Sequence, residues 1–119
     1  MEAIQIAKKI ESKIAMIQKY RGELKDRAER KSKAIAMYDK FLALTIIKLR
    51  NGAEVEFEGQ LIKDPPVTII EKIAKGICFE HKLELEDAES SYKSLITNID
   101  CVQAELNGLQ SINRHLDSL

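Results

Sequence analysis

The sequence has little of what sheet proteins, membrane proteins and disulfide-linked domains require. Its 119 residues include no Trp, three Phe, three Tyr, five Gly and two Pro. This shortage of aromatic and turn residues argues against a β-sandwich or a β-barrel. No apolar run approaches the roughly 18 residues that a membrane-spanning helix needs, and the N-terminal residues lack the pattern of a secretion signal. We therefore expect a cytoplasmic protein without a membrane partner.

Cysteine is also scarce, because only Cys78 and Cys101 are present, both in the second half of the chain. On one straight helix these two residues would lie about 35 Å apart. A disulfide requires Cα atoms within about 7 Å. If that helix is continuous, an intrachain disulfide is excluded, and reduced cysteines are expected.

Charge, in contrast, is abundant and is sorted by half. Up to Arg50 there are 13 Lys and Arg against 6 Asp and Glu, and from Asn51 onward there are 6 against 13. The halves therefore carry about +7 and −7, and the formal net charge is +0. Because opposite charges attract, this division favours a chain that folds back on itself as a hairpin.

The first half, residues 2–50, is predicted to form one long helix. Its apolar residues recur at alternating spacings of four and three, which is the heptad pattern of helices that pack side by side. Arg21 and Lys31 interrupt the pattern, and Asn51-Gly52 supplies a C-cap that ends the helix. The apolar seam consists of Ala7, Ile10, Ile14, Ile17, Leu24, Ala28, Ile35, Tyr38, Leu42, Thr45 and Leu49.

Residues 51–64 are predicted to form a small β-like insertion. Apolar residues alternate there with Glu, which is the period of a strand, and Glu58-Gly59 could turn the chain back into a second strand. One interpretation is an edge that pairs with a partner protein. The alternative is that the insertion closes the end of the helical bundle, with Phe57 plugging its core. The partner-binding candidates are Val55, Phe57, Leu61 and Ile62.

Residues 65–117 are predicted to be helical again. Asp64 is a good N-cap and proline is tolerated in a first helical turn, while Thr68 and Glu71 offer an alternative capping box slightly later. The apolar phase is unclear near residues 76–82, so one long helix and two consecutive helices both remain open. The fold expected for residues 1–119 is a single all-α domain, a long antiparallel helical hairpin. A dimer or higher oligomer would complete a helical bundle.

The segment 19–33 is strongly basic and is the candidate site for an anion. Lys and Arg gathered on one helical face could contact the phosphates of a nucleic acid. The alternative is a solvated face with ion pairs to nearby or facing acidic residues. Arg21 and Lys31 fall on the seam, where they could hold a nucleotide between protomers or form a polar layer. The anion-binding candidates are Arg21, Lys25, Arg27, Arg30, Lys31 and Lys33.

The sequence shows no pattern that indicates catalysis, a metal or a cofactor. Cys78-x-x-His81 offers two ligands, but a zinc site needs about four and no second pair is within reach. Cys101 lies in a regular helical segment without a nearby His to act as its base. We therefore expect a protein that is not an enzyme and has no cofactor.

Three stretches of the sequence are similar to those of a known group of proteins. They are residues 48–52 (Lys-Leu-Arg-Asn-Gly), 63–66 (Lys-Asp-Pro-Pro) and 106–114 (Leu-Asn-Gly-Leu-Gln-Ser-Ile-Asn-Arg). With them the chain resembles small helical proteins encoded by phages and prophages of Gram-positive bacteria. The resemblance implies an accessory protein of the host cytoplasm that acts by binding a host or phage protein, such as an inhibitor of a host defence system. A nucleic-acid-binding accessory protein and an oligomer that sequesters a nucleotide are the alternatives.

Overall fold

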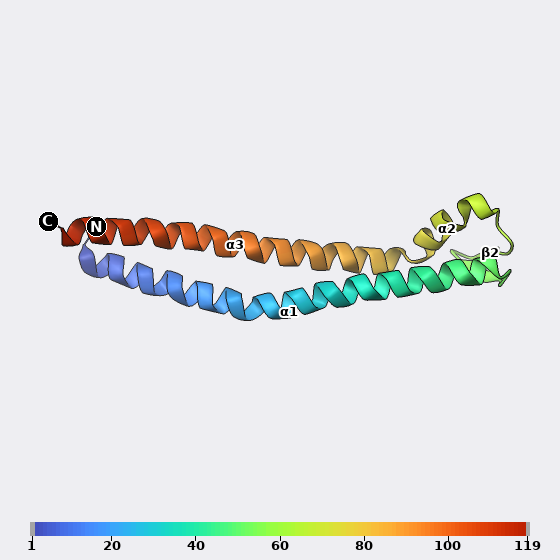
Figure 1. Ribbon diagram of the computed structural model, residues 1–119, viewed down its shortest axis with the longest axis horizontal. Helices are drawn as coiled ribbons and strands as arrows, with labels where there is room; N and C mark the ends of the chain where they lie inside the picture. The colour runs from blue at the N-terminus through green and yellow to red at the C-terminus, as the bar shows by residue number, and fades with distance from the viewer. Residues whose placement is uncertain (1, 119) are drawn as a thin grey trace. The chain divides into compact units, whose positions relative to one another are not determined.

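The computed structural model describes residues 2–118 and consists almost wholly of helix. Helix α1 spans Ala3–Arg50, α2 spans Ile70–Ile77 and α3 spans Phe79–Asp117. Between α1 and α2 lie strands β1 (Val55–Phe57) and β2 (Gln60–Ile62) and the short 3-10 helix η1 (Val67–Ile69). Helices α1 and α3 run antiparallel to each other (Figure 1). The predicted all-α hairpin with a small β-like insertion is therefore confirmed.

The chain divides into two compact units, and α1 and α3 contribute to both. The terminal unit contains residues 2–29 and 90–118, and the central unit contains Arg30–Glu89. In the terminal unit Ile17 packs against Val102 and Leu106, and Leu95 is fully buried. This interior is a narrow apolar stripe on each helix, as the heptad spacing predicts.

The core of the central unit is built around Tyr38. Its ring lies among the buried side chains of Ala34, Cys78, Leu85 and Ala88. Next to this cluster the rings of Phe41 and His81 stack nearly in parallel, with centroids 4.4 Å apart. The stacked rings fix which residues of α1 and α3 face each other in this unit.

The apolar seam of α1 is wider than the surface that α3 covers. Ile17 and Tyr38 are buried, but Ile14 and Ile35, on an adjacent row of the same helix, are 40% and 36% exposed. Part of the apolar seam is therefore left exposed by α3. The reason is that one α3 helix, with a narrow stripe of its own, covers about two rows of a neighbouring helix.

Gly52 ends α1, as predicted. It adopts φ +76°, and its N–H donates to the Leu49 carbonyl at 3.3 Å while the Ala53 N–H donates to the Lys48 carbonyl at 3.0 Å. This is the hydrogen-bond pattern of a Schellman motif, which satisfies carbonyls that the helix leaves without partners. The helix end is therefore determined by local sequence.

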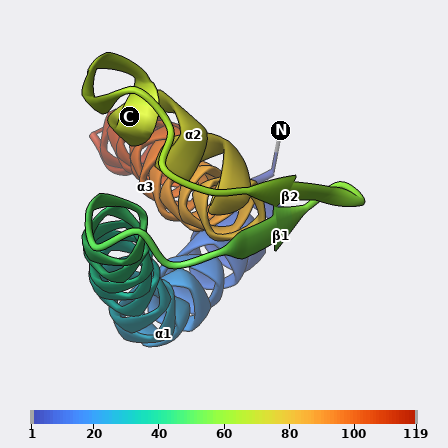
Figure 2. The same cartoon turned by 90° about the vertical axis from the view of Figure 1, so that its right-hand side faces the viewer.

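Strands β1 and β2 form a two-stranded antiparallel ribbon in which Val55 pairs with Ile62 and Phe57 with Gln60. The turn residues Glu58 and Gly59 have φ values of 51° and 73°. Positive φ at both positions is typical of a type I′ turn, whose twist matches that of the strands. Figure 2, which looks onto this end of the central unit, shows both strands as a narrow ribbon beside α2.

The second helical half begins later than residue 65 and is broken. Pro66 disfavours helical geometry at Pro65, the residue before it, and Pro66 itself is extended with ψ 137°. Helical turns therefore begin only at Val67. Neither η1 nor α2 has a side-chain cap, so the caps predicted at Asp64 and Thr68 are absent from these helix starts. Cys78, with φ −89° and ψ 20°, separates α2 from α3 inside the window predicted for a break.

Candidate functional site

The predicted partner-binding residues of the β insertion do not share one surface. Val55 and Ile62 pack on an apolar cluster of Leu49, Ile70 and Ala74, the tip cluster. The Phe57 ring comes within 3.9 Å of the position where Gly76 would carry a Cβ, so it lies against α2. Only Leu61 among the four candidates is strongly exposed. The insertion thus covers the tip cluster with one face and leaves Leu61 on the other.

A pocket, the tip pocket, opens next to the tip cluster and shares Leu49 and Ile70 with it. Its volume is about 480 Å³. Leu49 and Ile70, only 1% and 3% exposed, are buried beneath it, whereas Val67 is 76% exposed. Sequence reasoning missed this pocket because the Asp-Pro-Pro-Val stretch reads as an ordinary helix start. The lining residues are Leu49, Arg50, Asp64, Pro65, Val67 and Ile70.

Arg30, from the predicted anion-binding segment, is held by carboxylates of α3. Its guanidinium donates to both oxygens of Glu84, at 2.9 and 3.1 Å, and to Asp87 at 2.6 Å. The hydrogen bonds to Glu84, and then those to Asp87, raise the pKa of Arg30 above its ordinary value. A guanidinium that already donates to two carboxylates has few N–H groups left to bind a phosphate.

Arg27 is engaged in a similar way in the terminal unit. Its guanidinium donates to the Ser91 carbonyl oxygen at 2.9 Å and to Glu23 at 3.2 Å. Lys25 lies 4.0 Å from Glu29 but remains strongly exposed. Arg27 and Arg30 therefore both bind residues of α3. The sequence alone did not show whether these arginines contact α3 or a phosphate.

The other basic candidates lie at different depths. Arg21 and Lys33 are exposed, and Lys31 is half-buried. The hypothesis of a nucleotide held between protomers by Arg21 and Lys31 stays a prediction. Within segment 19–33 the exposed basic residues are Lys19, Arg21, Lys25 and Lys33.

A groove of about 360 Å³ lies between α1 and α3 in the central unit. Its lining carries both signs of charge, and the buried Ala34 leaves room at its centre. His81, stacked on Phe41, forms part of the α3 side. The lining residues are Arg30, Lys33, Ala34, Met37, His81 and Glu84.

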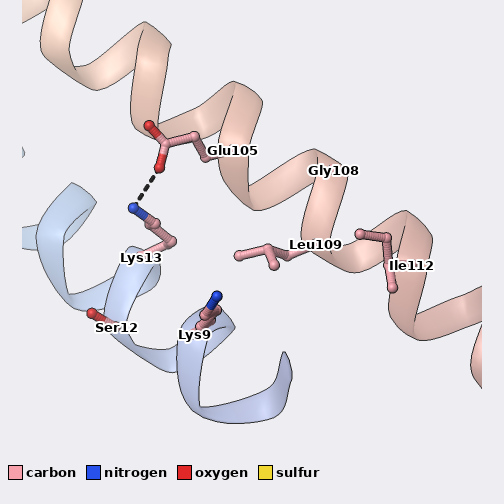
Figure 3. A pocket seen from close by; sticks show the side chains of 7 residues that line it. All are labelled: Lys9, Ser12, Lys13, Glu105, Gly108, Leu109 and Ile112. Carbon is pink, nitrogen blue, oxygen red and sulfur yellow. Dashed lines mark ion pairs between the residues drawn. The ribbon is translucent and has the colours of Figure 1, made fainter. Parts of the chain in front are cut away.

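A larger and mainly apolar groove, of about 520 Å³, lies in the terminal unit. Figure 3 shows Leu109 pointing from α3 toward α1, one residue after Gly108. Lys13 forms an ion pair with Glu105 at one edge, and Lys9 and Ile112 lie at the other. The polar and charged residues of the lining are Lys9, Ser12, Lys13 and Glu105.

Neither cysteine is in a disulfide; Cys78 is buried and Cys101 is exposed. Cys78 Sγ lies 3.5 Å from the Thr45 hydroxyl, which is not a base. Within residues 2–118 no group of three or more His, Cys, Asp or Glu is placed to hold a metal ion. In the same part of the chain no helix has the length and apolar character needed to cross a membrane.

No family model, curated protein or solved structure matches this chain. Functional inference therefore depends on the geometry of the tip pocket, the grooves and the charged rows of the two units.

Proposed function

We propose that the protein acts by binding another protein, and that the tip pocket is the surface that holds the partner. The observation that carries this proposal is the apolar floor of Leu49 and Ile70 beneath the strongly exposed Val67. A concave apolar surface that is open to solvent is the usual anchor site for a partner side chain. A connector that merely reverses the chain needs about 2–8 residues, so the longer connector has room for a further role.

The lining of the tip pocket suggests the chemistry of the anchor. An aliphatic side chain would fill the space between Leu49, Val67 and Ile70. Arg50 and Asp64 at its edge would pair with polar or charged groups next to that side chain, which gives orientation more than affinity. The expected partner therefore presents an exposed Leu, Ile or Met flanked by polar residues.

The resemblance to phage and prophage proteins suggests where the partner is found. We propose a host protein in the cytoplasm of a Gram-positive bacterium, and inhibition of a host defence system as the outcome of binding. Binding without catalysis suffices for inhibition, because an occupied interface blocks the assembly or the substrate access of the target.

The experiment is affinity capture from a lysate of a Gram-positive bacterium with the full chain and two variants. Val67→Asp places a charge in the tip pocket, and Thr68→Asp adds the same charge one residue away. We expect one dominant captured protein whose recovery falls at least about tenfold with Val67→Asp, equivalent to about 1.4 kcal/mol, but is unchanged with Thr68→Asp. Equal recovery with both variants, at equal helicity by circular dichroism, would refute the tip pocket as the binding surface.

A second candidate function is nucleic-acid binding, supported by the exposed Arg21, Lys25 and Lys33. The appropriate triple variant changes these three residues to Glu and leaves Arg27 and Arg30 intact, because those two arginines are already hydrogen-bonded within the chain. If this function holds, wild-type affinity for DNA or RNA falls steeply with salt and the triple variant loses it. Absence of retention on either nucleic acid at low salt excludes it.

A further inference from the structure

A second row of residues runs along α1 in the central unit, next to the face that α3 covers. Its members are spaced by three and four, which places them on one side of the helix. Leu44 and Ile47 of this row are 43% and 54% exposed, and Lys33 and Lys40 are also exposed. This basic and apolar row consists of Arg30, Lys33, Met37, Lys40, Leu44 and Ile47.

An acidic row of α3 lies on the same side of the central unit. Arg30 reaches both Glu84 and Asp87, and Glu84 lines one groove with Lys33 and Met37. Glu80 precedes Glu84 by one helical turn and therefore belongs to the same face. All three carboxylates are exposed. One side of this unit thus presents a basic and apolar row beside an acidic row.

The chain also exposes more surface than a compact protein of its size. Its accessible area is 8449 Å². A globular monomer of 13.5 kDa exposes about 6,500 Å². The difference is larger than the roughly 800 Å² per partner that a stable protein interface buries. The chain therefore has enough accessible surface to contain an interface of ordinary size.

We propose that a second copy of this chain covers this side of the central unit, with a twofold axis along the hairpin. The α1 row of each copy then lies antiparallel on the acidic α3 row of the other. Because Phe41 stacks on His81, Lys40 and Glu80 lie at the same height, and Lys40 of one copy meets Glu80 of the second. The result is a closed four-helix arrangement in which every contact occurs twice.

Charge selects this pairing over its alternatives. If the α1 row packed on itself, Lys33 and Lys40 would face the same residues of the second copy, which is repulsive. Packing α1 on α3 places Lys40 beside Glu80 and, two turns away, Lys33 near Asp87. The carboxylates of α3 keep oxygens available for these further contacts. The groove between the two rows, about 360 Å³, gives space for a side chain of the second copy such as Met37.

The first test is sedimentation equilibrium of the full chain at up to about 100 μM. We expect a species of twice 13.5 kDa, and a dissociation constant at least about tenfold weaker with Leu44→Asp. The control is Leu61→Asp, at a leucine of strand β2 that is 65% exposed and belongs to neither row, and it should leave the dimer intact. A wild-type monomer over this range, or equal loss with both variants, would overturn the proposal.

The second test is a charge exchange that addresses the pairing itself. Lys40→Glu and Glu80→Lys should each weaken the dimer several-fold, and the double variant should recover most of the loss, because it recreates the ion pair with reversed signs. The dissociation constants should converge when NaCl rises from about 50 to 500 mM, since salt screens exposed pairs. Failure of the double variant to recover any affinity would reject the α1-to-α3 arrangement, whatever the tip pocket binds.

Discussion

At the residue scale, Gly52 decides where α1 ends and where the connector begins. Its φ of +76° is a conformation that residues with a Cβ adopt at a cost. A Cβ there would also lie 2.9 Å from Oδ1 of Asp64, closer than real Cβ atoms come to an oxygen. Backbone conformation and lack of space therefore both require glycine at this position.

Gly52→Ala should lower the free energy of unfolding by about 1–3 kcal/mol, because the left-handed conformation is strained for alanine and the Asp64 carboxylate must move. Urea denaturation followed by circular dichroism measures the change. The same substitution at Gly22, in the middle of α1 with no neighbouring atom within 4 Å of its Cβ, is the control. There alanine should stabilise by about 0.5–1 kcal/mol. Equal effects at the two glycines would contradict this account of the Schellman motif.

At the element scale, the β insertion shows what sequence can and cannot predict. The alternation of Val55 and Phe57 with glutamates predicted the strands, and Glu58-Gly59 predicted the turn, because strand period and turn chemistry are local properties. Which face would be covered depends on residues distant in sequence, namely Gly76 and the tip cluster. The sequence therefore left open whether Phe57 binds a partner or closes the bundle.

The helix boundaries also show which features local sequence predicts and which it does not. The C-cap at Gly52 was predictable, because Schellman geometry involves only neighbouring residues. The predicted start at residue 65 was too early, because the restriction that Pro66 places on the residue before it outweighed the capping signal of Asp64. The tip pocket follows from this late start, since Val67 lies in η1 and is left exposed. A pocket formed by an unusual connector has no short motif that could reveal it.

Phe57→Ala should destabilise the protein by about 1–3 kcal/mol, less than the loss for a fully buried Phe, because the ring is only partly buried against α2. Chemical denaturation gives the magnitude, and Leu61→Ala, on the exposed side of the same ribbon, should change stability by less than about 0.5 kcal/mol. If Phe57→Ala leaves stability unchanged, the ring does not close the tip. Because Phe57→Ala is expected to destabilise the tip, loss of partner binding in this variant would not by itself show that Phe57 contacts the partner.

At the scale of the whole molecule, the division of charge predicted attraction between the halves, and each unit contains such contacts. Lys13 pairs with Glu105 in the terminal unit, and Arg30 pairs with Glu84 and Asp87 in the central unit. The sequence could not identify these partners. Pairing depends on which row of α1 faces α3, and α3 leaves Ile14 and Ile35 of the apolar seam partly exposed. The net charge of each half thus predicts that the halves attract each other, whereas the register of the helices determines which residues form the ion pairs.

These ion pairs make thermal stability depend on salt in a defined way. Because the pairs are exposed, each contributes little and is screened as the ionic strength rises. We expect the melting temperature to fall by about 2–5 °C between roughly 20 and 500 mM NaCl. The measurement uses circular dichroism in a Leu44→Asp background, so that self-association does not contribute.

Arg30→Gln should reduce the salt dependence because it removes contacts to two carboxylates, whereas Lys25→Gln, at a side chain 82% exposed, should leave it unchanged. A melting temperature that is constant or rises with salt would show that apolar packing alone holds α1 and α3 together.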